Sequence, residues 1–384
     1  MMLRLIFILC LAPGLIATAQ VARQITQPNE KLDFDHLYDA AERAREQNQD
    51  KEAIDLLHRA LALRPDSQEA LWYLGTLYYE NNDYAASRDT LRRFLTLRPD
   101  AGPGWAFLGL SEFQMREYKR ALDHLEKATA AGLGDRAELT RIVLFDQAIL
   151  LTRVERFDES MDILVKLLTA DLQDPSIIEA AGLAGLRLPL LPAEIPADEH
   201  KLIDLTGRAV VALESQHNRE AEIAFQQLLT AYPNEPGVHF LAGAYRMQLQ
   251  PEEAIPEFEQ ELRISPSHVL ARVRMAEQLL AQREADRALE MAQAAIRLEP
   301  NRASAHMLAG EALLLKGESE TGIEELETAR RYAPEVSRTH WDLLRAYAAA
   351  GRKDDMAREK EQIDHLLHGN QSTHLGEPAD VPNN

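Results

Sequence analysis

The sequence predicts an all-α fold built from short helix pairs that stack one after another along the chain. Two observations support this prediction: a proline that recurs at a nearly fixed spacing, and two amphipathic helix patterns between successive prolines. A fixed period of roughly 20–50 residues is typical of repeated copies of one small unit, not of a single compact domain. The recurring prolines, spaced 33 or 34 residues apart within two series, are Pro65 and Pro99, then Pro233, Pro266, Pro300 and Pro334.

The second unit shows how one repeat is organised. Leu71 and Leu74 lie at helical spacing on one face of a first helix. An Asn-Asn-Asp run then indicates a turn, and a second amphipathic helix follows. Pro99 ends that helix, because proline has no N–H and disfavours helix in the residue before it. Gly75 and Ser87 are small, which allows two antiparallel helices to approach closely.

These units resemble the tetratricopeptide repeat family, whose signature is Trp, Leu-Gly and Tyr on the first helix, Ala and Phe on the second, and a closing Pro. The residues that carry the resemblance are Leu74-Gly75, Tyr78 and Pro99 in unit two, and Trp105 and Leu108-Gly109 in unit three. The resemblance spans residues 34–368. It implies a right-handed α-solenoid of about nine helix-turn-helix units, in which neighbours bury each other's apolar faces.

An irregular joint is expected in the middle of the array. Residues 188–197 (LPLLPAEIPA) contain three prolines and cannot form a helix. We interpret the joint as a packed connector, a flexible hinge or an edge used by a partner. The predicted organisation is a signal peptide over 1–19, a linker over 20–33, units one to four over 34–174, a lone helix with the proline-rich joint over 175–200, units five to nine over 201–368, and a disordered tail over 369–384.

The first residues predict export. Arg4 precedes an apolar run of about 12 residues, and Ala17-Thr18-Ala19 fits a cleavage site before Gln20. The run is shorter than the roughly 20 residues that span a bilayer. We therefore expect a periplasmic or secreted protein, or a membrane-anchored one if the segment is not cleaved. Cys10, the single cysteine, lies inside this segment, so the mature chain would have no disulfide, thiol nucleophile or cysteine-based zinc site.

The net charge and the absence of catalytic motifs exclude several classes of function. The formal net charge is −20, from 62 acidic and 42 basic residues, and we expect this acidity to be spread over solvated helix faces. Such a chain lacks the basic surface that nucleic acid requires and disfavours docking on anionic lipid. No phosphate-binding loop, nucleophile elbow or HExxH motif is present in the sequence. We therefore predict that the protein is not an enzyme and that it binds no cofactor and no metal.

The resemblance implies that positions 2, 5, 9 and 12 of each unit face the concave side of the array. Aromatic and methionine residues at such positions are typical of protein-binding surfaces. The candidate binding residues are Trp72, Tyr79, Phe113, Phe145, Phe240, Met247, Met307 and Trp341. The leading hypothesis is an exported, non-enzymatic scaffold that binds a protein or peptide along the concave face.

Two other hypotheses stay open. One is a structural component of the cell envelope that self-associates, as a homo-oligomer, or bridges a complex without a peptide ligand. The other, weaker hypothesis is a small-molecule or glycan binder, or an enzyme, with a pocket at the joint near Pro189–Pro196.

Overall fold

The computed structural model describes residues 28–168 and 174–369. Within these ranges it contains nineteen α-helices and two short 3-10 helices and no strand, which confirms the all-α prediction. The chain divides into two units between Val143 and Leu144. The predicted signal peptide, most of the predicted linker and the tail beyond residue 369 lie outside the described residues. Among the described residues, no helix combines the length and the apolar character needed to cross a bilayer.

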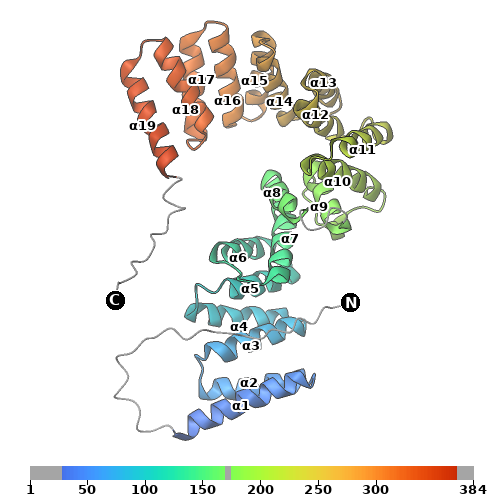
Figure 1. Ribbon diagram of the computed structural model, residues 1–384, viewed down its shortest axis with the longest axis vertical. Coiled ribbons are helices and arrows are strands. Elements are labelled where there is room, and N and C mark those ends of the chain that lie inside the picture. Colours follow the sequence, from blue (N-terminus) through green and yellow to red (C-terminus); the bar gives the residue numbers. More distant parts are fainter. Residues whose placement is uncertain (1–27, 169–173, 370–384) are drawn as a thin grey trace, which may run out of the picture. The chain divides into compact units, whose positions relative to one another are not determined.

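The first unit contains three helix pairs (Figure 1). Helix α1 contacts α2, α3 contacts α4, and α5 contacts α6, while α2 packs on α3 and α4 on α5. Helix α1 begins at Pro28, ahead of the predicted start at Phe34, since proline is well tolerated in the first turn, where its missing N–H is not needed. The bounds are α1 Pro28–Glu46, α2 Asp50–Leu63, α3 Gln68–Glu80, α4 Tyr84–Leu97, α5 Gly102–Gln114 and α6 Tyr118–Ala131.

The second unit begins within α7 and repeats the same arrangement. Helix α10 contacts α11, α12 contacts α13, α14 contacts α15, α16 contacts α17, and α18 contacts α19. The bounds are α7 Ala137–Arg153, α8 Phe157–Leu168, α9 Pro175–Gly185, η1 Pro192–Glu194, α10 His200–Glu214, α11 Asn218–Ala231, α12 Val238–Leu249, η2 Pro251–Glu253, α13 Ala254–Ile264, α14 Val269–Ala281, α15 Ala285–Leu298, α16 Ala303–Leu315, α17 Ser319–Tyr332, α18 Ser337–Ala349 and α19 Lys353–Gly369.

Small residues set the spacing within a helix pair. A Cβ atom added to Gly75 would lie 2.8 Å from the side chain of Leu91 on the facing helix. The Ser87 hydroxyl donates a hydrogen bond of 2.8 Å to the Gly75 carbonyl oxygen, and Ser160 makes the same 2.8 Å bond to the Ala148 carbonyl. The expectation that Gly75 and Ser87 permit a close approach of the helices is confirmed.

The helix predicted to stand alone is paired, so that expectation is wrong. Helix α9 packs on α10 and also contacts α8. A Cβ atom on Gly182 would lie 2.1 Å from the Ile203 carbonyl oxygen, and one on Gly207 would lie 1.9 Å from the Ile178 carbonyl oxygen. Glycine at both positions lets the two backbones touch, and the array of contacts therefore continues through α9.

The proline-rich joint is packed against this part of the fold. Leu191 and Ile195 are buried, and Ile195 belongs to the apolar core shared by α9, α10, α11 and α12. The Arg153 guanidinium donates a hydrogen bond of 2.6 Å to the Pro189 carbonyl oxygen. The joint lies inside the second unit, since the division between the units falls in α7.

A side chain satisfies the carbonyl of each closing proline. At five of the six prolines the donor lies six residues later, at the start of the next first helix. The imidazoles of His239, His306 and His340 also reach a glutamate of the paired second helix through their other ring nitrogen. The six contacts are Arg93 to Pro65, Trp105 to Pro99, His239 to Pro233, Arg272 to Pro266, His306 to Pro300 and His340 to Pro334.

Burial of one carboxyl on α7 predicts a pH-dependent stability. Burial raises the pKa of Asp146 from 3.8 to about 7. A pKa that is higher in the folded than in the unfolded state means that stability falls as the pH rises from about 4 to 7. We expect the free energy of unfolding of Asp146→Asn to rise by up to about 4 kcal/mol relative to that of the wild type as the pH increases from about 4 to 7. This value is an upper bound, because the side chain keeps some solvent access.

Urea denaturation of the wild type and of Asp146→Asn between pH 4 and pH 8 measures this difference in the free energy of unfolding. Asp162→Asn, at an exposed position on α8, is the control and should show no such gain. Parallel pH curves for Asp146→Asn and the wild type would contradict the assignment.

Candidate protein-binding surface

The first helices of successive pairs lie next to one another. Helix α3 contacts α5 in the first unit, and in the second unit α12 contacts α14, α14 contacts α16, and α16 contacts α18. We call the side of these helices that carries repeat positions 2, 5, 9 and 12 the first-helix face. A surface made from three or more neighbouring helices is long enough to bind an extended segment of another chain.

In the first unit the candidate residues form part of an aromatic cluster. The Trp72 ring lies 5.5 Å from that of Phe94 and 5.6 Å from that of Phe107, and the Tyr79 ring lies 5.2 Å from that of Phe107. Trp72 and Tyr79 are half-buried, whereas Phe94 and Phe107 are buried. Phe113 is also half-buried. These side chains therefore contribute to packing and expose only part of their rings.

In the second unit the candidate residues differ in accessibility. Phe145, Phe240 and Met247 are half-buried, and the latter two pack against an apolar core. Met307 is buried in that core, with an exposed fraction of 8%. Trp341 on α18 is 45% exposed, which makes it the most accessible of the eight candidates.

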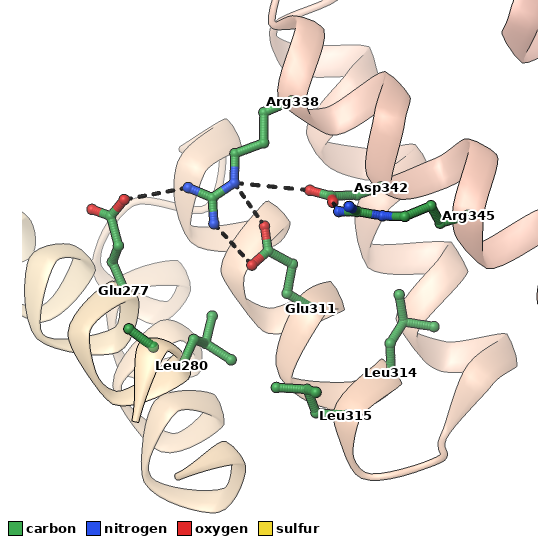
Figure 2. Close-up of a pocket in the computed structure, with 9 residues that line it drawn as sticks. Glu277, Leu280, Glu311, Leu314, Leu315, Arg338, Asp342 and Arg345 are labelled. Atoms are coloured by element: carbon green, nitrogen blue, oxygen red, sulfur yellow. Dashed lines mark hydrogen bonds and ion pairs between the residues drawn. The ribbon is translucent and has the colours of Figure 1, made fainter. Parts of the chain in front are cut away.

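Three successive first helices line one pocket of about 560 Å³ (Figure 2). Charged side chains lie along one wall, and leucines line the other. Helix α14 contributes Glu277, Leu280 and Ala281, α16 contributes Glu311, Leu314 and Leu315, and α18 contributes Arg338, Asp342 and Arg345. The pocket therefore offers both apolar surface and fixed charge to a ligand.

Arg338 connects the charged residues of the pocket. Its guanidinium lies 2.9 Å from Glu311 and 3.3 Å from Glu277, and its Nε lies 4.0 Å from Asp342 Oδ2. Burial, followed by the neighbouring Asp342 carboxylate, raises the pKa of Glu311 from 4.5 to about 7. Two close carboxyl groups in a partly desolvated site resist being ionised together.

A sequence model described as tetratricopeptide repeat matches residues 38–102 and 273–326. The first match covers most of α1 to the start of α5, and the second runs from α14 into α17. Both matched segments are helix pairs in the structure, with the small residues and closing prolines of that repeat. The chain is a tetratricopeptide repeat protein. It is accordingly an α-solenoid scaffold for protein–protein interaction.

Solved structures similar to this tetratricopeptide repeat protein include several of MamA. A MamA double mutant (RS-1) is 24% identical with a TM-score of 0.40, and it aligns over 45% of this chain and 96% of its own. A truncated MamA from Desulfovibrio magneticus RS-1 is 24% identical with a TM-score of 0.39, over 45% and 96%. Another MamA is 20% identical with a TM-score of 0.40, over 48% and 100%. No curated protein matches the chain.

Six of the nine pocket residues occupy inward positions of the tetratricopeptide repeat. Glu277, Glu311 and Arg345 are spaced 34 residues apart, at position 9 of three successive units. Arg338 stands at position 2, and Leu280 and Leu314 stand at position 12. The predicted binding residues are aromatic residues and methionines at such positions, and they do not include these charged residues. Reading the charges at position 9 along the repeats would have identified Glu277, Glu311 and Arg345.

Proposed function

We propose that this tetratricopeptide repeat protein is an exported, non-enzymatic scaffold that binds a segment of a partner protein along its first-helix face. The observation that carries the proposal is the pocket of α14, α16 and α18, where three consecutive repeats contribute their inward positions to one concave site. The exposed Trp341 on α18 supports it, since tryptophan is enriched among the residues that dominate binding energy.

Export and the lack of catalysis are parts of the same proposal. The apolar run before Gln20 supports secretion with cleavage near Ala19, to the periplasm or the cell exterior. The repeat array supports a binding role, because each position of the fold recurs along the chain instead of converging on one reactive centre.

A capture experiment tests this function. The mature chain is immobilised, incubated with envelope extract and crosslinked, and captured proteins are identified by mass spectrometry. We expect Trp341→Ala to reduce capture of the specific partner by tenfold or more, about 1.4 kcal/mol, because truncation of a central aromatic contact typically costs at least this much. The exposed position means that the variant should fold normally.

Leu298→Ala is the matched control. Leu298 has the same exposed fraction, 45%, but lies on the second helix α15. Capture that Trp341→Ala and Leu298→Ala leave equally intact would remove the first-helix face around Trp341 from the proposal. Recovery of this chain alone, in place of another protein, would support self-association.

A further inference from the structure

The pocket of α14, α16 and α18 holds more carboxylates than cations. Glu277, Glu311 and Asp342 supply three carboxyl groups, against the guanidiniums of Arg338 and Arg345. Arg338 is shared among all three carboxyl groups. The Arg345 side chain contacts Asp342 but is 76% exposed, so solvent screens much of its charge. When all groups are ionised, the pocket has one negative charge in excess.

One oxygen in this pocket lacks a donor. The Asp342 side chain is 3% exposed, and its Oδ2 has no hydrogen-bond partner within the described part of the chain. Figure 2 shows this carboxylate directed toward Arg338, whose Nε is 4.0 Å away, beyond hydrogen-bond distance. A buried carboxylate oxygen without a donor is unfavourable, and a cation that reaches it would form a charge-assisted hydrogen bond.

The Glu311 carboxyl group is also affected by the shortage of positive charge in the pocket. The pKa of Glu311 is raised to about 7, first by burial and then by Asp342. The other charged groups that line the pocket around it are Glu277 from α14 and Arg338 and Arg345 from α18. An additional cation between Glu311 and Asp342 would allow both carboxyl groups to ionise.

We propose that this pocket receives the lysine or arginine side chain of a partner protein, with the cation held between Glu311 and Asp342. The leucine wall of α14 and α16 would hold the aliphatic stem and an apolar neighbour, since lysine and arginine combine an apolar stem with a charged head. Leu315 is 51% exposed there and can be covered on binding. This inference rests on the proposed function, because it specifies the chemistry of the segment that the first-helix face binds.

Two short peptides test the inference on the full chain. The probe is acetyl-Gly-Leu-Lys-Leu-Gly-amide, and its control carries Nε-acetyl-lysine at the centre, which removes the charge and keeps the stem. Binding is followed through the methyl NMR signals of Leu314 and Leu315. We expect the lysine peptide to bind about tenfold more tightly or better, because close charge pairs across an interface contribute at least this factor. Glu311→Gln should remove most of the preference.

Two further variants act as controls. Glu277→Gln removes a charge at a more exposed edge of the pocket, with a side chain that is 30% exposed, and should weaken the preference less than Glu311→Gln. Glu290→Gln removes a charge from an exposed position on the second helix α15 and should leave the preference unchanged.

Equal affinity for the two peptides, no methyl response to either, or an intact preference in Glu311→Gln would overturn the inference. The capture experiment with Trp341→Ala reports on the scaffold function separately. If capture succeeds and the peptides are not distinguished, the cation assignment alone is wrong.

Discussion

Replacing Gly207 by alanine is expected to destabilise the second unit by about 2 kcal/mol or more. The new Cβ atom would lie 1.9 Å from the Ile178 carbonyl oxygen, and backbone cannot move aside as a flexible side chain can. Overpacking a close contact typically costs about 1–3 kcal/mol, and a rigid obstacle places this substitution at the upper end. The roughly 1 kcal/mol that alanine gains in helix propensity offsets only part of the loss.

Chemical denaturation and hydrogen exchange measure this effect, with Gly185→Ala as the control. Gly185 is the last residue of the facing helix α9, and the nearest atom to its new Cβ would be a methyl group of Val210 at 3.2 Å. That neighbour can shift slightly, so we expect a change of less than about 1 kcal/mol. If Gly207→Ala is as stable as Gly185→Ala, the close contact between α9 and α10 is not present in solution.

Replacing Leu74 by aspartate is expected to unfold several helix pairs of the first unit together. Leu74 is 1% exposed, and burying an unpaired carboxylate costs several kcal/mol. Short helices are marginal in water when they stand alone, so each pair depends on its neighbours. Hydrogen exchange should therefore show loss of protection across α1 to α6 and not in α3 alone.

Leu63→Asp is the matched control for this experiment. Leu63 is 37% exposed at the end of α2, and a surface substitution there should change stability by no more than about 0.5 kcal/mol. Protection lost only in α3 and α4 of Leu74→Asp would show that the pairs melt independently, against the nearest-neighbour coupling expected of a repeat array.

The helix pairs were predictable because their contacts recur. Gly75 and Pro99 have a packing and a chain-ending role within one unit, and the same residue types return at the same repeat positions as Gly109 and Gly310, and as Pro300 and Pro334. The fold class and the close approach of the two helices at Gly75 and Ser87 therefore followed from the sequence alone.

Charged residues inside the fold were not predictable in this way. The acidic residues were expected on solvated faces, yet Glu112, Glu261 and Glu359 are buried. Glu261 on α13 accepts hydrogen bonds of 3.0 and 3.1 Å from the Gly237 N–H, which directly precedes α12. Glu261 therefore caps the N-terminus of the paired helix α12. A carboxylate on one helix and an amide 24 residues away have no shared local pattern.

The sequence by itself determined the repeating unit and the helix boundaries near each proline. Only the tertiary structure decided that α9 pairs with α10 and that Arg338 meets Glu277, 61 residues earlier in the chain. The physical reason is that periodicity reports on contacts that every unit makes. The pocket depends on differences between units, where the same position is glutamate in two repeats and arginine in the third.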